Sequence, residues 1–309
     1  MTTINPEKRP QNIPLGIGLV IAAALTIATQ DVIFKLFSSE LTLWQIFALR
    51  ALMAIPLFVA LAFSQGKLKE VFVGSVEFWT LLRGAFFTLT FMAYYAAVPF
   101  QSLAILGAAN YTAPIFITLI SAFIIHEAVS TRGWLGVCIG FAGVLVLLQP
   151  GTDAFSYWTL LPLLGAFFYS WAHIITRTKC QSTPLLTMAF SVNLMMLVAG
   201  LAMSLVFMYW QLGDGLAQSH PYLFGNWAPV GLEEWLVLGV LAVFTTGIAI
   251  LLAGAYKAAP PSIVATFEYS YLVFVAVYDF VFFSILLTPM GILGIAMIVG
   301  AGILVMRRR

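Results

Sequence analysis

The sequence consists mostly of long apolar segments, each about as long as the hydrocarbon core of a membrane is thick. A helix crosses a core of about 30 Å with about 20 apolar residues. Of the 309 residues, 62% are hydrophobic and 8% are charged, which is too little polar surface for a soluble fold of this size. The sequence therefore predicts an all-α integral membrane protein with ten transmembrane helices. The predicted spans are residues 14–37, 41–63, 78–97, 102–124, 132–149, 157–178, 184–208, 233–254, 261–283 and 289–306.

The basic residues of the loops gather on one side of this predicted bundle. When the loops are assigned alternately to the two sides, one side receives eleven Lys and Arg residues and the other receives none. By the positive-inside rule the basic side faces the cytoplasm, which places both termini there. We therefore expect a multi-pass protein of the cell (inner) membrane, with a cytoplasmic tail over residues 1–13 and a basic end over residues 307–309.

Polar residues recur at matching depths in the two halves of the chain. The first predicted helix carries two of them four residues apart, and the sixth helix does so 142 residues later. Each half holds five spans, an odd number, so the two copies would enter the membrane from opposite sides, an arrangement typical of transporters. The predicted repeats cover residues 14–151 and 152–306. The recurring pairs are Asp31 with Lys35, and His173 with Arg177.

Several motifs of the sequence resemble a known transporter family. The first half contains Tyr111-Thr112-Ala113-Pro114, followed by Gly140-Phe141-Ala142-Gly143, and the ninth predicted helix contains Glu268-Tyr269-Ser270. Together with Arg50, these residues resemble the drug/metabolite transporter superfamily, and within it the ten-helix proteins made of two EamA domains. The resemblance implies a secondary transporter, with export or exchange of a small metabolite favoured.

Two charged residues are predicted to lie deep in the membrane, where an unpaired charge costs about 2.5–3.5 kcal/mol on insertion scales. Arg50 would bind a carboxylate or phosphate of a substrate, or form a structural ion pair with Asp31 or Glu268. Glu268 would couple transport to protons or bind a substrate amine, or pair with Arg50. Both interpretations of each residue remain open from the sequence.

Asn110 is the predicted counterpart of Glu268 in the first half. Pro114 lacks an amide hydrogen, so the carbonyl of Asn110 loses its helical partner, and at membrane depth such a group needs a cavity or another partner. We therefore expect Asn110 and Glu268 to form the centre of a substrate site. The full predicted substrate-binding set is Arg50, Asn110, Tyr111, Trp171, Glu268 and Tyr271.

The recurring polar pairs lie toward opposite membrane surfaces and are candidates for two gates. Residues four apart share one helix face, so Asp31 with Lys35, and His173 with Arg177, could close the path alternately. The alternative is that they form local ion pairs or capping contacts.

The charges of both signs at mid-depth favour a small zwitterion, such as an amino acid or a related amphipathic compound, moved by alternating access. The alternative is uptake of a larger metabolite such as S-adenosylmethionine or riboflavin, and an intramembrane lipid-handling protein or enzyme is less favoured. We predict no catalytic site, cofactor or metal, and no nucleic-acid partner for a chain of net charge +2. The expected partners are the solute and the bilayer, with a monomer or a homodimer through the glycine-rich spans 132–149 and 289–306.

Overall fold

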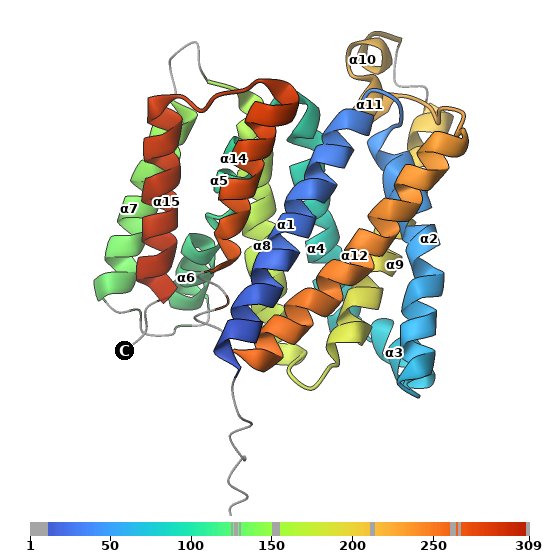
Figure 1. Ribbon diagram of the computed structural model, residues 1–309, viewed down its shortest axis with the longest axis horizontal. Helices are drawn as coiled ribbons and strands as arrows, with labels where there is room; N and C mark the ends of the chain where they lie inside the picture. The colour runs from blue at the N-terminus through green and yellow to red at the C-terminus, as the bar shows by residue number, and fades with distance from the viewer. Residues whose placement is uncertain are drawn as a thin grey trace, which may run out of the picture.

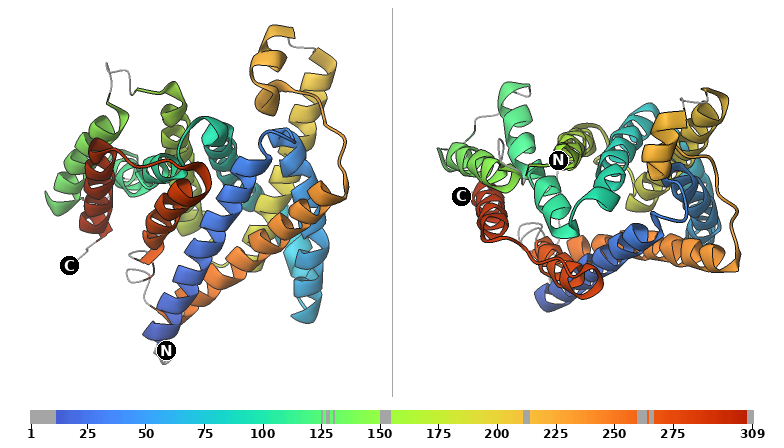
Figure 2. Two further views of the ribbon diagram at one scale, coloured as in Figure 1. Left: turned by 45° about the horizontal axis from the view of Figure 1, so that its top comes forward. Right: turned by 90° about the horizontal axis from the view of Figure 1, so that it is seen from above.

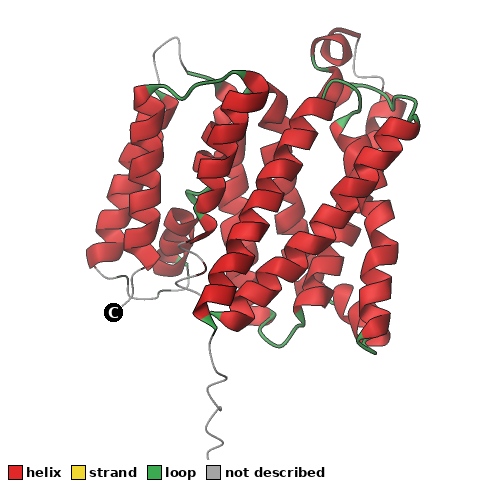
Figure 3. Cartoon of the chain, in the orientation of Figure 1, coloured by secondary structure: helices red, strands yellow, loops and turns green. Residues whose placement is uncertain are grey.

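A computed structural model describes residues 12–124, 126, 129, 131–149, 155–210, 214–259, 264 and 267–306. This part of the chain is built of helices joined by short loops (Figures 1 and 3). Most of the predicted tail at 1–13, the basic end at 307–309 and the boundary at 151–152 between the predicted repeats lie outside the described residues.

Eight helical segments of the described residues are long and apolar enough to cross a membrane, and they coincide with the first eight predicted spans. Two further apolar helices match the ninth and tenth spans. The prediction of an all-α membrane protein is confirmed, while the number of ten crossings stays a prediction. The helices of the spans are α1 (Ile13–Phe37), α2 (Leu43–Ser64), α4 (Phe78–Ala97), α5 (Leu103–Asn110) with α6 (Ala113–Phe123), α7 (Thr131–Leu148), α8 (Leu160–Lys179), α9 (Leu185–Trp210), α12 (Leu232–Ala258), α14 (Ser270–Phe283) and α15 (Pro289–Met306).

Short helices fill several of the connections. They are α3 (Leu68–Ser75), η1 (Val98–Phe100), η2 (Tyr157–Thr159), α10 (Asp214–Ser219) and α11 (Pro221–Phe224). The start of α1 and the end of α15 lie at the same end of the bundle, at the bottom of Figure 1. That arrangement agrees with termini on one side of the membrane, and the assignment of this side to the cytoplasm stays a prediction.

Side-chain caps begin three of the membrane helices. The side-chain oxygens of Asn12, Thr42 and Ser102 each accept a hydrogen bond from the amide three residues further on, at 3.1, 3.3 and 3.3 Å. The first amides of a helix have no partner within the helix, and lipid offers them none. The caps therefore fix where α1, α2 and α5 start.

The α7·α15 pair lies on the left side of the bundle in Figure 1, and α2, α9 and α12 lie on the opposite side (Figures 1 and 2). The backbones of α7 and α15 approach so closely that a Cβ added at Gly294 would lie 2.9 Å from the amide nitrogen of Leu147 and 3.0 Å from the carbonyl oxygen of Gly143. Gly143 and Gly294 thus pack these two helices together within one chain. A homodimer through the same helices stays a prediction.

Candidate functional site

The fourth predicted span is interrupted near its middle. Helix α5 ends at Asn110, Tyr111 and Thr112 form a turn, and α6 begins at Ala113. The span predicted over residues 102–124 is confirmed as Leu103–Phe123, and the helix is interrupted within it at Tyr111 and Thr112. The missing amide hydrogen of Pro114 explains the break, because the helical bond to the carbonyl of Asn110 cannot form.

The ninth span contains a turn as well, at Tyr269 directly before α14, while part of its predicted start lies outside the described residues. The two interruptions touch each other. The hydroxyl of Tyr111 donates to the backbone carbonyl of Glu268 at 2.9 Å, and the rings of Tyr111 and Tyr269 lie 5.0 Å apart. Irregular backbone at membrane depth requires such internal partners. The structure therefore brings together the two segments that the sequence pairs by internal repetition.

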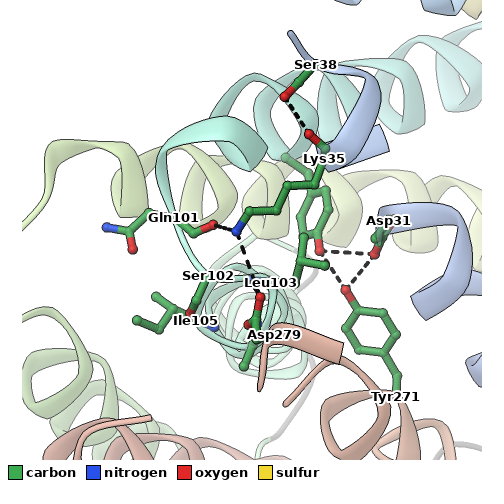
Figure 4. Close-up of polar contacts among 11 residues, drawn as sticks. Asp31, Lys35, Ser38, Gln101, Ser102, Leu103, Ile105, Tyr271 and Asp279 are labelled. Atoms are coloured by element: carbon green, nitrogen blue, oxygen red, sulfur yellow. Dashed lines mark hydrogen bonds and ion pairs between the residues drawn. The ribbon is translucent and has the colours of Figure 1, made fainter. Parts of the chain in front are cut away.

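Asp31 of α1 lies at the centre of a buried tyrosine cluster. Its side chain is 2% exposed, and its oxygens accept hydrogen bonds from Tyr95 at 2.8 Å, Tyr271 at 2.6 Å and Tyr94 at 3.2 Å. The hydroxyls of Tyr94 and Tyr271 are themselves 2.6 Å apart. Short hydrogen bonds to a carboxylate are the strong kind, and they replace the hydration that the buried group has lost. Figure 4 shows Asp31 facing Tyr271 across the gap between α1 and α14.

The cluster extends to a fourth helix. The side-chain amide of Gln30 donates to the Tyr95 hydroxyl at 2.9 Å, and the Thr245 hydroxyl of α12 donates to the Gln30 oxygen at 3.2 Å. Helices α1, α4, α12 and α14 are therefore joined by one polar network. We call these six residues the Asp31 network: Gln30, Asp31, Tyr94, Tyr95, Thr245 and Tyr271.

Arg50 is buried beside this network without a carboxylate partner. It is 3% exposed, and one terminal nitrogen donates to the sulfur of Met196 at 3.2 Å, while its Nε atom has no partner. Its guanidinium carbon lies 5.3 Å from the centre of the Phe34 ring, and Phe34 stacks on Tyr95 with ring centres 4.0 Å apart. Between two described residues, the only ion pair within 4.0 Å is the one of Lys35 and Asp279.

Among the described residues Arg50 forms no ion pair within 4.0 Å, so its pairing with Asp31 or Glu268 stays a prediction. A guanidinium carries five N–H donors and is always charged. A buried guanidinium with a thioether acceptor and two aromatic neighbours retains donors for an anionic group.

Lys35 and Asp31 share a helix face but have different partners. The ammonium of Lys35 donates to the carbonyl of Gln101 at 2.6 Å and lies 3.8 Å from a carboxylate oxygen of Asp279 on α14 (Figure 4). Asp279 in turn accepts hydrogen bonds from the amides of Leu103 and Ala104, at 3.1 and 2.8 Å. Asp279 thus caps α5 from another helix. The alternative of a local ion pair between Asp31 and Lys35 was wrong.

The remaining predicted site residues lie along α5 and α8. The side-chain oxygen of Asn110 is buried without a hydrogen-bond partner and faces Gly165 of α8. Trp171 stacks on Phe86 of α4, with ring centres 6.2 Å apart. Trp171 therefore packs α8 against α4.

His173 lies between the rings of Tyr169 and Phe87, at 4.2 and 5.6 Å, and its Nε2 atom is buried without a partner. Arg177 is exposed near the end of α8. Within the part of the chain that is described, no three His, Cys, Asp or Glu residues could hold a metal ion.

Sequence reasoning missed Tyr94 and Tyr95, which supply two of the three hydroxyls on Asp31. They stand next to each other in the last turn of α4, where both are buried, and an aromatic pair in a membrane helix ordinarily indicates packing. The signal that could have found them is the hydroxyl itself, because a buried phenol in lipid needs a hydrogen-bond acceptor.

Comparison with known proteins identifies the same family as the sequence motifs. The EamA-like transporter family matches residues 14–149. The chain is 27% identical over 266 residues to a riboflavin transporter of Vibrio cholerae, covering 84% of this chain and 79% of that one. It is 22% identical over 214 residues to an S-adenosylmethionine uptake transporter of Rickettsia felis, covering 68% and 70% of the two chains.

A solved crystal structure shares the fold with a TM-score of 0.58 at 19% sequence identity, covering 95% of each chain. The matched domain and the named relatives confirm the resemblance that the motifs carry. The chain is similar to EamA-type members of the drug/metabolite transporter superfamily, and its residues 14–149 match the EamA-like transporter family.

Proposed function

We propose that this protein is a secondary transporter that moves a small metabolite across the inner membrane by alternating access. The observation that carries the proposal is the contact of the two interrupted spans, in which Tyr111 donates to the carbonyl of Glu268 at 2.9 Å. Interrupted helices that meet within the membrane are typical of transporter binding sites, because their free backbone groups and polar side chains can bind the solute. Asn110 and Glu268 lie at these two interruptions and are the proposed centre of the site.

The packing of the helices supports two inverted five-helix repeats. The predicted counterparts in the two halves are α1 and α8, α2 and α9, α4 and α12, and α7 and α15. When each helix is exchanged with its counterpart, the packed pair α1·α12 becomes the packed pair α8·α4, and α2·α12 becomes α9·α4. The pairs α2·α9 and α7·α15 turn into themselves. Two halves related in this way can rock against each other around a site between them.

The charges of the described site favour a solute that carries both signs. Arg50 has N–H donors that an acid group of the solute can occupy. The carboxylates of Asp31 and Glu268 supply the negative charge that a solute amine requires. Arg50 and Asp31 flank the stacked rings of Phe34 and Tyr95, so a solute between them would meet an apolar surface and two charges. We infer an amino acid or a related amphipathic compound, with export or exchange.

The second candidate is uptake of a larger metabolite, and the relatives favour it. One of them is named for riboflavin and another for S-adenosylmethionine. S-adenosylmethionine also carries an amino-acid group, so the same two charges would serve it.

A counterflow assay tests the proposal. Purified protein in liposomes preloaded with unlabelled solute is given labelled amino acids, S-adenosylmethionine or riboflavin, with and without a pH gradient. We expect one of these solutes to accumulate, Arg50→Ala to lose its binding, and Arg50→Lys to retain part of it. If none of the solutes moves, both substrate candidates are wrong.

The coupling group is tested in the same liposomes with Glu268→Gln and Asp31→Asn. A variant that keeps exchange but loses accumulation driven by the pH gradient identifies its residue as the coupling carboxylate, because only gradient-driven transport requires the proton to be carried. Equal transport in both variants and in the wild type would show that neither carboxylate takes part.

A further inference from the structure

A pocket of about 430 Å³ opens at the end of the bundle where α1 ends, away from the described start of α1 and end of α15. It lies between the turn that joins η1 to α5 and the loop over residues 284–288, which joins α14 to α15 at the top of Figure 1. Its walls combine two phenylalanine rings and aliphatic side chains with a few polar groups. The lining residues include Lys35, Phe100, Gln101, Ser102, Phe283 and Leu286.

Lys35 is the only charged residue among those that line this pocket. Its ammonium has three N–H donors, and one of them is used by the carbonyl of Gln101. The carboxylate of Asp279 lies 3.8 Å away, which is an ion-pair distance but too long for a hydrogen bond. Two donors of Lys35 thus have no hydrogen-bond acceptor among the described residues, although its side chain is only 10% exposed.

The charge of Asp279 is already engaged elsewhere. Both of its oxygens accept amides from the first turn of α5, where the positive end of the helix dipole also stabilises a negative charge. The positive charge of Lys35 is therefore only partly neutralised, and the ring of Phe283 lies 4.6 Å from its nitrogen.

We propose that this pocket binds an anionic group attached to an apolar or aromatic body, with Lys35 as its cationic anchor. Phe100 and Phe283 supply the apolar walls, and the free donors of Lys35 receive the carboxylate or phosphate. The anion comes either from a dissolved solute or from the headgroup of a lipid. The site is separate from the proposed site at Asn110 and Glu268, and binding to it does not require transport.

The test compares benzoate with benzamide, which have the same shape but differ in charge. Their dissociation constants are measured by ligand-observed NMR on the full chain in nanodiscs of phosphatidylcholine, with empty nanodiscs subtracted. We expect benzoate to bind about tenfold more tightly than benzamide, as one charge-assisted hydrogen bond predicts. Lys35→Gln should bring the ratio close to one, and Lys35→Arg should keep it.

A second variant keeps the proposal testable if Lys35→Gln does not fold. Leu286 is 74% exposed and lines the pocket, so Leu286→Trp should fill it and weaken both probes. Leu293→Trp, at an exposed position of α15 that does not line the pocket, is the matched control and should change neither.

Nanodiscs that contain phosphatidylglycerol distinguish the two sources of the anion. If a lipid headgroup occupies Lys35, this lipid should weaken benzoate binding to the wild type and not to Lys35→Gln. If the site takes dissolved solutes, the lipid should have no effect. Equal binding of the two probes to the wild type, no binding of either, or a benzoate preference that survives in Lys35→Gln would overturn the proposal.

Discussion

The cap that Asp279 forms on α5 allows a stability prediction that can be worked out bond by bond. Its two oxygens accept the amides of Leu103 and Ala104, and both of these residues are 0% exposed. Water therefore cannot replace either bond. An orphaned buried donor costs about 1–3 kcal/mol.

Asp279→Asn keeps one side-chain oxygen and so orphans one amide, which predicts a loss of about 1–3 kcal/mol in the free energy of unfolding. Asp279→Ala orphans both amides and should cost about 2–6 kcal/mol. The long contact with Lys35, at 3.8 Å, adds a smaller amount in each case.

The measurement is the unfolding free energy in mixed micelles of mild detergent and SDS, followed by circular dichroism. Glu77 provides a matched control, because this exposed carboxylate sits at the N-cap of α4 and makes no capping bond. Glu77→Gln should stay within about 0.5 kcal/mol of the wild type. An Asp279→Asn protein as stable as that control, or an Asp279→Ala protein no less stable than Asp279→Asn, would refute the reasoning.

Three further predictions concern the tyrosines and the helix contacts. In a double-mutant cycle of Tyr94→Phe and Tyr271→Phe, the unfolding free energies should be non-additive by up to about 1.7 kcal/mol, because either hydroxyl can donate to Asp31 when the other is gone. Gly294→Ala should destabilise by about 1–3 kcal/mol in thermal or SDS unfolding, whereas Gly300→Ala, with nothing within 4 Å of the added Cβ, should not. Tyr111→Phe should slow counterflow while leaving the amount of folded protein unchanged on gel filtration, since it removes the bond between the two interrupted spans.

The membrane helices could be predicted from the sequence because lipid imposes the same length and apolar composition on every span. That constraint acts within each segment and does not depend on which helices pack together. The turn at Tyr111 is a different case. Pro114 indicated a freed carbonyl at Asn110, but whether a proline kinks a helix or breaks it depends on the partners that the freed groups find. Here the turn is held from far along the chain, by the hydrogen bond from the Tyr111 hydroxyl to the carbonyl of Glu268.

In the candidate site, too, the spacing within one helix predicted which residues share a face, but not which residues of other helices they contact. The spacing of Asp31 and Lys35 correctly predicted that they share one helix face. It also suggested that the two residues pair with each other. Their actual partners are on α4, on α14 and at Gln101 in the turn before α5, and no periodicity within α1 records them. Charge alone drew attention to Arg50, while the hydroxyls of Tyr94 and Tyr95 were hidden in an apolar helix.

Helices α1 and α14 are joined through carboxylates at two separate points, by Asp31 with Tyr271 and by Lys35 with Asp279, in addition to the 3.1 Å contact between the hydroxyls of Thr29 and Tyr278. The two carboxylate contacts are about 6 Å apart along α1 and about 12 Å apart along α14, at about 1.5 Å per residue. A helix held at one point can roll about it, but a helix held at two points resists both rolling and sliding. Helix α14 therefore either travels with α1 as one rigid arm or releases both contacts in a single step. Motion at this end of the bundle should accordingly be abrupt, with few intermediate positions.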